Sequence, residues 1–84
     1  MSESKADVIL DVKGLACPMP VVKTKRAIDG MGSGQTLEVI ATDPASKGDI
    51  PAFLERLGHE LVEISENDGI FSFLIRKNGE DIKV

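Results

Sequence analysis

Apolar and polar residues alternate along four short runs of the chain, which is the pattern of half-buried strands. In the first run, "VILDV" at residues 8–12, the first, third and fifth side chains share one apolar face. A second run covers residues 35–42 ("QTLEVIAT"). Two more, at residues 60–65 and 70–77, are separated by "ENDG", whose Asn-Asp-Gly is a strong signal for a tight turn. The last two runs are therefore predicted to form a hairpin.

The segment after the first strand has the spacing of a helix. The sequence "PMPVVKTKRAIDGMG" at residues 18–32 opens with proline and closes with glycine, the order that helices favour. Helical spacing places Val21, Val22 and Ile28 on one side. We expect this side to pack on the sheet.

A second helix is predicted within "DPASKGDIPAFLERLG" at residues 43–58. Asp49 is a plausible N-cap, Pro51 then falls in the first turn, and Gly58 ends the helix. The expected order is β-α-β-α-β-β. Because strand-helix-strand crossovers are right-handed, both helices should cover the same face of the sheet. The fold class is thus an α/β two-layer sandwich with a four-stranded mixed sheet.

Length and composition indicate one globular domain, residues 1–84, with an ordered core of about 7–77 and polar, frayed ends. Hydrophobic residues make up 42% of the chain and charged residues 29%, and Phe53, Phe71 and Phe73 are core candidates. The net charge of −4 argues against strong nucleic-acid binding. The sequence has no signal-peptide pattern and no apolar run long enough for a membrane span, so we expect a cytoplasmic protein.

The single cysteine stands between the first predicted strand and the first predicted helix, in "ACPMP". We expect Cys17 to be the N-cap, because the residue before a proline avoids helical dihedral angles. Pro18 and Pro20 then stiffen the first turn, and the Met19 N–H is left as a donor that the sulfur can reach. This donor and the positive end of the helix dipole should lower the pKa of the Cys17 thiol. Pro18, Met19 and Pro20 are thus predicted to shape the site.

The small number of cysteine and histidine residues limits the chemistry that is available to this thiol. One cysteine allows neither an internal disulfide nor thiol exchange within the chain. One cysteine and one histidine, His59, cannot build a metal site without many carboxylates, and a catalytic pair of the two is unproven. A buried, structural Cys17 is the alternative. The setting favours a lone nucleophile that accepts a group and passes it to another molecule.

The sequence from Leu10 to Lys77 resembles the TusA/SirA-like sulfur carriers. The resemblance rests on Cys-Pro-x-Pro in "LDVKGLACPMPVVKTKRAI" and on "DP", "DIPAF" and "GHEL" in order within "ATDPASKGDIPAFLERLGHEL". It implies the β-α-β-α-β-β fold and a persulfide on Cys17, with no cofactor beyond this transient sulfur. It also implies a cysteine desulfurase or a rhodanese as the sulfur donor. The acceptors would be proteins of tRNA 2-thiouridine synthesis, molybdenum cofactor synthesis or sulfur oxidation.

Other polar residues near the predicted site have two interpretations. Asp43 and Asp49 follow the second strand and could shape the site, although turn-making and helix capping are the preferred roles. Lys23, Lys25 and Arg26 lie within about a turn of the cysteine. They form either a solvated helix face or a docking surface for acidic partners.

The sequence is compatible with three functions. The leading hypothesis is a sulfur carrier, monomeric when free, that takes sulfur on Cys17 and relays it to partner proteins. The alternative is a small regulatory or RNA- or protein-binding module in which Cys17 is structural. Its acidic charge and lack of Tyr and Trp count against RNA binding. A thiol redox sensor is disfavoured because the chain has no resolving cysteine.

Overall fold

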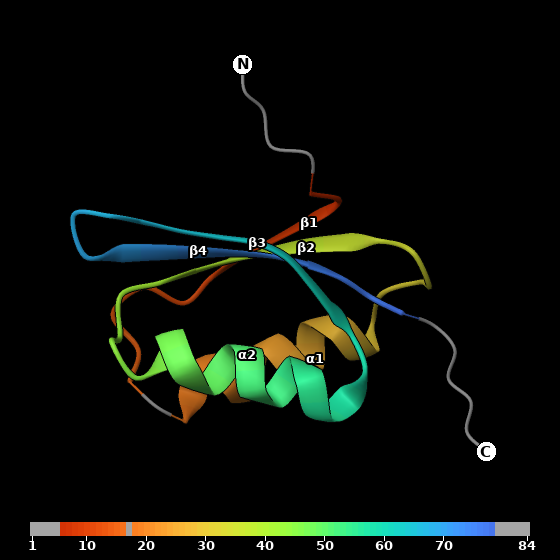
Figure 1. The fold of residues 1–84 in the computed structure, drawn as a ribbon, viewed down its shortest axis with the longest axis horizontal. Helices are drawn as coiled ribbons and strands as arrows, with labels where there is room; N and C mark the ends of the chain where they lie inside the picture. The colour runs from red at the N-terminus through yellow and green to blue at the C-terminus, as the bar shows by residue number, and fades with distance from the viewer. Residues whose placement is uncertain (1–5, 17, 79–84) are drawn as a thin grey trace.

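The computed structural model describes residues 6–16 and 18–78, which form a four-stranded sheet with two helices on one face (Figure 1). In chain order the elements are β1 (Val8–Asp11), α1 (Met19–Asp29), β2 (Thr36–Ala41), α2 (Ser46–Leu57), β3 (Glu60–Asn67) and β4 (Ile70–Arg76). The predicted order and two-layer fold class are confirmed. The predicted frayed ends are residues 1–6 and 78–84, of which 1–5 and 79–84 lie outside the described residues. Asn78 is described, and its hydrogen bonds to His59 and Gly58 hold it in place.

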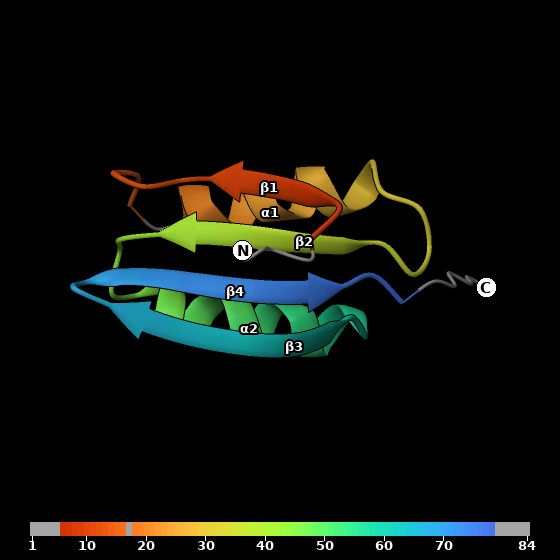
Figure 2. The same ribbon diagram turned by 90° about the horizontal axis from the view of Figure 1, so that it is seen from above.

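The strands lie in the order β1-β2-β4-β3. β1 and β2 are parallel, whereas β4 is antiparallel to both of its neighbours, so the sheet is mixed as predicted. Seen from above, α1 lies beneath the β1 side of the sheet and α2 beneath the β3 side (Figure 2). Because β1 and β2 run in the same direction, the loops that follow them lie at one edge of the sheet.

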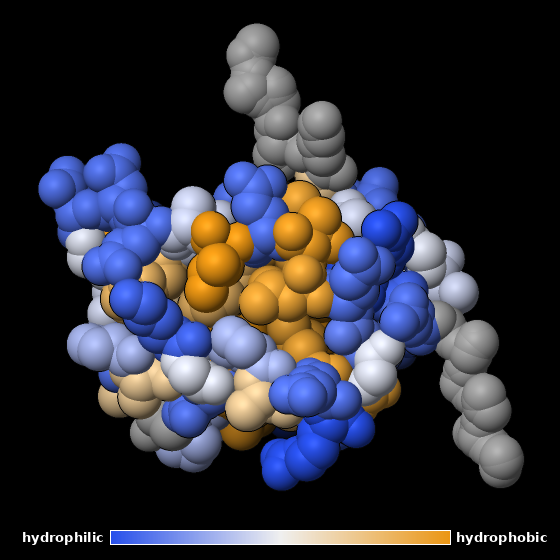
Figure 3. All heavy atoms as spheres, in the orientation of Figure 1, coloured by the Kyte–Doolittle hydropathy of each residue, from blue (hydrophilic) through white to orange (hydrophobic). Residues whose placement is uncertain are grey.

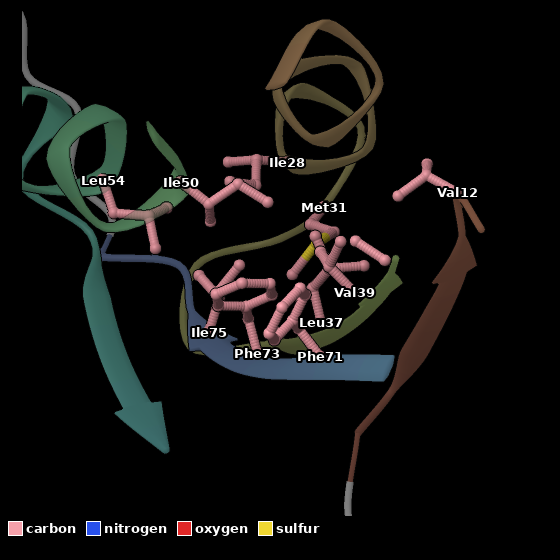
Figure 4. Packing of buried hydrophobic residues seen from close by; sticks show 11 residues of the cluster. Val12, Ile28, Met31, Leu37, Val39, Ile50, Leu54, Phe71, Phe73 and Ile75 are labelled. Atoms are coloured by element: carbon pink, nitrogen blue, oxygen red, sulfur yellow. The ribbon is translucent and has the colours of Figure 1, made fainter. Parts of the chain in front are cut away.

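The hydrophobic core fills the space between the sheet and the two helices (Figure 4). On β2 the predicted alternation is confirmed, since Leu37, Val39 and Ala41 are fully buried. β4 adds Phe71 and Phe73, which are also buried. Burial of a Leu, Val or Phe side chain contributes about 1.5–3 kcal/mol, so this layer is a main contribution to the stability of the fold.

The buried side of α1 differs from the predicted one. Ile28 is buried and Val21 half-buried, but Val22 is 41% exposed. The buried row is Pro20, Thr24 and Ile28, at intervals of one helical turn. Thr24 fits there because its Oγ1 donates a hydrogen bond to the Pro20 carbonyl at 2.7 Å, which satisfies the hydroxyl. The prediction failed because it counted apolar residues and excluded a threonine whose hydroxyl bonds within the helix.

The predicted start of α2 is also wrong. The helix begins at Ser46, and Asp49 lies inside it, where its N–H donates to the carbonyl of Ala45 at 3.0 Å. Pro51 therefore sits beyond the first turn, where the missing N–H removes one hydrogen bond that the helix tolerates. The end was predicted correctly, since Gly58 adopts the left-handed conformation with φ +83°.

β3 and β4 form the predicted hairpin. Asn67 pairs with Ile70, and the two turn residues Asp68 and Gly69 have φ of +54° and +79°. Positive φ at both positions matches the turn type that joins twisted strands most tightly. Near its start β3 carries a register shift between Leu61 and Glu63, so its pairing with β4 is interrupted there.

Candidate functional site

Two loops meet at the edge of the sheet where β1 and β2 end. The Gly14 N–H in the β1–α1 loop donates to Oγ1 of Thr42, just after β2, at 2.9 Å. The two loops are therefore joined directly at this edge. Cys17 itself lies outside the described residues, but its neighbours Ala16 and Pro18 are both exposed. The structure thus places both sides of the cysteine at the surface of this edge.

The start of α1 differs from the predicted one by a residue. The first carbonyl that accepts a helical hydrogen bond belongs to Pro18, which bonds the Val22 N–H at 3.0 Å, so Pro18 and not Cys17 is the N-cap. The Met19 N–H donates to the carbonyl of Ala16 at 2.9 Å. It is therefore not the free donor predicted for the sulfur. Two prolines near one helix start leave the first helical residue ambiguous in the sequence.

The three residues after the cysteine have different environments. Pro18 is exposed, and Met19 is 41% exposed at the first position of α1. The Pro20 ring is fully buried in the core. Because proline fixes φ and this ring is enclosed, the first turn of α1 is held firmly against the sheet.

The solvent side of α1 combines apolar and basic residues. Met19, Val22, Lys23 and Arg26 are exposed and follow the spacing i, i+3, i+4, i+7, so they share one face, which we call the α1 outer face. Val22 is as exposed as Met19, at 41%. The sequence prediction placed Val22 in the core, although its distance of three residues from Met19 is a signal for a shared surface.

Lys25 differs from Lys23 and Arg26 because it forms an ion pair. Its Nζ lies 2.8 Å from Oδ2 of Asp29, one turn further along α1. The hydrogen bond from Lys25 lowers the pKa of the Asp29 carboxyl, so this carboxyl stays ionised and offsets the lysine charge. Within residues 6–16 and 18–78, Lys23 and Arg26 make no ion pair. Of the three predicted basic residues, Lys25 is therefore neutralised by Asp29, and Lys23 and Arg26 can bind acidic groups of a partner.

The β2–α2 loop is shaped by Asp43. Its Oδ1 accepts a hydrogen bond from the Ala45 N–H at 3.4 Å, the turn-making interaction preferred in the sequence analysis. Asp49 lies in the first turn of α2, where the helix dipole favours a negative charge. The hydroxyl of Ser46 at the start of this helix is buried and has no hydrogen-bond partner within the described part of the chain. Nothing in the sequence predicted this last feature.

His59 lies at the opposite end of the molecule from the two loops. It stands directly before β3, and its Nδ1 accepts a hydrogen bond from the Asn78 N–H at 3.2 Å. Burial and the nearby Lys77 charge lower the pKa of His59. The ring therefore ties the end of β4 to the start of β3 and is not brought to the loops that flank Cys17.

Residues 6–16 and 18–78 contain neither a metal-binding cluster nor a membrane-spanning helix. No three His, Cys, Asp or Glu side chains gather there into a group that could hold a metal ion. In the same part of the chain, neither helix has the length and apolar character needed to cross a membrane.

Comparisons with known proteins agree with the fold and place the chain in a family. The profile of the family described as "Sulfurtransferase TusA" matches residues 8–77. The protein named sulfur carrier protein TusA from Allochromatium vinosum is 49% identical over 72 residues, which cover 86% of this chain and 95% of the relative. The protein of the same name from Pseudomonas putida is 42% identical over 80 residues, covering 95% and 100%.

The fold has a solved counterpart as well. The crystal structure of a SirA-like protein from Desulfitobacterium hafniense has a TM-score of 0.76 and 26% identity, and the match covers 86% of this chain and 99% of that one. The family profile covers α1, α2, the β1–α1 loop that contains Cys17 and the β2–α2 loop. The chain therefore belongs to the TusA sulfurtransferase family.

Proposed function

We propose that the protein is a sulfur carrier and that Cys17 carries the sulfur as a persulfide. The observation that supports this most is the position of the cysteine loop. Ala16 and Pro18 are exposed at an edge where the β1–α1 loop is tied to Thr42, so a partner protein can reach this segment. The named relatives are sulfur carriers and match the chain across this loop.

The proposed transfer is balanced without an added oxidant or reductant. The Cys17 thiolate attacks the outer sulfur of a persulfide on the donor protein, and a new S–S bond forms as the old one breaks. The donor leaves as a thiolate, and Cys17 holds the outer sulfur. An acceptor thiolate then attacks that outer sulfur, and Cys17 leaves as a thiolate in turn.

The α1 outer face is the surface that we propose for docking of these partners. It starts at the cysteine loop with Met19 and Val22 and continues with the cations Lys23 and Arg26. Exposed apolar residues beside uncompensated positive charge suit a partner surface with apolar and acidic residues. The face begins two residues after Cys17 in the sequence, so a partner that docks here binds beside the segment that holds the cysteine.

The identity of the partners belongs to the same proposal. A cysteine desulfurase or a rhodanese is the donor, and the acceptors are proteins of tRNA 2-thiouridine synthesis, molybdenum cofactor synthesis or sulfur oxidation. We propose a monomer in the free state, acting in the cytoplasm, where reducing conditions keep an unloaded cysteine as a thiol.

Intact-mass analysis tests the carrier proposal. The full chain is incubated with a cysteine desulfurase and free cysteine and is measured without reductant. We expect the mass to rise by one sulfur atom and to return after dithiothreitol, whereas Cys17→Ser should gain nothing. If several desulfurases and rhodaneses add no sulfur to the wild-type chain, the carrier proposal fails and a binding module with a structural cysteine replaces it.

Charge reversal tests the docking surface. The double variant Lys23→Glu, Arg26→Glu should be loaded with sulfur more slowly than wild type, and the difference should shrink at high salt because screening weakens long-range attraction. Lys25→Glu is the matched control, since the wild-type lysine is already paired with Asp29. Equal slowing by the control and the double variant would contradict the assignment of Lys23 and Arg26.

A further inference from the structure

The side of the molecule formed by β3 and α2 exposes a group of apolar residues. Leu57, Val62 and Ile64 are 47%, 43% and 44% exposed, and Phe53 and Leu61 are half-buried against the core. Figure 3 shows hydrophobic side chains gathered in the middle of this side, over β3 and α2. Single exposed apolar residues are ordinary, whereas a contiguous group marks an interaction site. We call these five residues the β3–α2 patch.

The patch lies beside a strand edge that pairs with no other described strand. β3 is last in the order β1-β2-β4-β3, so β4 is its only partner among the described strands. The outer N–H and C=O groups of such a strand can pair with a strand of another chain. Every second side chain of an added strand would then lie on the helix side of the sheet, over the β3–α2 patch.

The charges along β3 indicate which strand would fit. Glu60, Glu63 and Glu66 recur along it. Glu60 is paired with Arg76 and Glu66 with Lys47, both at 3.1 Å. Glu63 is exposed and has no ion pair within the described residues. A strand with basic side chains would therefore meet a complementary edge.

The same charges disfavour two other occupants. A second copy of the chain, pairing through its own β3, would bring a second Glu63 to this edge and no basic residue of β3 to meet the first one. The register shift between Leu61 and Glu63 also disrupts a regular edge. The last residues of the chain, 79–84, read "GEDIKV" and carry two acidic residues against one basic residue. They do not complement an acidic strand.

We propose that β3 binds an extended segment of a second protein, in which apolar side chains alternate with Lys or Arg. The segment adds a strand to the sheet, covers the β3–α2 patch with its apolar side chains and faces Glu63 with a basic one. The patch extends from the junction of α2 and β3, at the opposite end of the molecule from the loops that flank Cys17 (Figure 1). A partner held here leaves the cysteine loop open, so the inference goes beyond the carrier proposal and does not depend on sulfur loading.

Nuclear magnetic resonance with the ¹⁵N-labelled full chain tests the proposal. The probe is a short, end-blocked peptide of alternating Lys and Val, and the comparisons are a Glu-Val peptide and a Lys-Val peptide that is N-methylated at alternate amides. We expect saturable shift changes of backbone amides in β3 and around Leu57 with the first peptide only. N-methylation should abolish binding because it removes the donors of the strand ladder.

Variants locate the binding surface. Ile64→Lys should weaken binding of the Lys-Val peptide by about tenfold, the loss typical of a well-packed interface residue. Glu63→Lys, a surface change that does not threaten folding, should also weaken binding, with a smaller effect at high salt. Val22→Lys is the matched control, because Val22 is similarly exposed, at 41%, on the α1 outer face. This control should leave the affinity unchanged.

Four results would overturn the proposal. The first is a shift pattern confined to the α1 outer face, and the second is equal binding of the Glu-Val or the N-methylated peptide. The third is a concentration-dependent dimer that Ile64→Lys abolishes, because a second copy would then occupy the edge. The fourth is slow amide exchange along β3 that becomes fast after removal of residues 79–84, because the chain's own end would then be the occupant.

Discussion

Lys77 holds together three parts of the fold that are far apart in the sequence. Its Nζ donates hydrogen bonds to the carbonyls of Ile28 at 2.9 Å and Met31 at 2.7 Å, at the end of α1. Its backbone bonds to Gln35 and Gly34, just before β2, at 2.9 Å each. Lys77→Met removes the charge and both side-chain hydrogen bonds while keeping most of the side-chain volume.

The expected loss of stability follows from these contacts. A hydrogen bond to a charged group contributes about 1.5–3 kcal/mol when it is well shielded, and a cation at a helix C-terminus contributes about 0.3–2 kcal/mol. Lys77 is only half-buried, so water can replace part of what the variant loses. We expect a decrease of about 2 kcal/mol in the free energy of unfolding, which lowers Tm by roughly 10 °C in a domain of this size.

Urea denaturation followed by circular dichroism measures this loss. Lys25→Met is the control, because it removes a lysine from an exposed ion pair with Asp29 on the same helix. Such a pair contributes about 0.3–0.5 kcal/mol. If Lys77→Met loses no more than this control does, the two carbonyl contacts do not stabilise α1 and the reasoning is refuted.

Two further predictions concern stability. Burial lowers the pKa of His59 in the folded state below its ordinary value of 6.5, so the unfolded chain binds the proton first as the pH falls. The free energy of unfolding should therefore decrease as the pH falls from 6.5 towards the folded pKa. In urea melts, His59→Gln should not show this decrease. If the variant has the same pH dependence as wild type, the decrease comes from other groups. Gly58→Ala should cost about 1–2 kcal/mol, because φ is +83° there. Gly48→Ala, inside α2 with nothing near the added Cβ, should stabilise the fold by up to about 1 kcal/mol. If thermal melts show that both glycine variants shift Tm in the same direction, these two expectations are contradicted.

The sheet was the most predictable part of the structure. Alternation along β2 gave the buried face of Leu37, Val39 and Ala41, because side chains on a strand have a fixed period of two. The hairpin turn was equally clear, because Asp68 and Gly69 tolerate positive φ. Both signals depend on local geometry, which the sequence contains directly.

The helix starts and the surfaces were less predictable. Pro18 and Pro20 are both compatible with a first helical turn, and only the hydrogen bond from the Val22 N–H to the Pro18 carbonyl shows that the helix starts directly after Pro18. The β3–α2 patch requires two segments to meet. On α1 the core contains Thr24, whose hydroxyl bonds within the helix, while the apolar Val22 is exposed. These outcomes depend on tertiary contacts that a pattern in one segment does not record.

A cycle of loading, discharge and reloading tests most directly whether Cys17 is a reusable carrier. The chain is loaded by a desulfurase, separated from it, treated with cyanide and loaded again, with the intact mass measured at each step. Cyanide attacks the outer sulfur and leaves as thiocyanate, so Cys17 returns as a thiolate. We expect the gain of one sulfur atom, its release as one thiocyanate per loaded chain, and a second gain of the same size. A first gain that cyanide does not remove, or a chain that cannot be loaded again, would contradict this expectation.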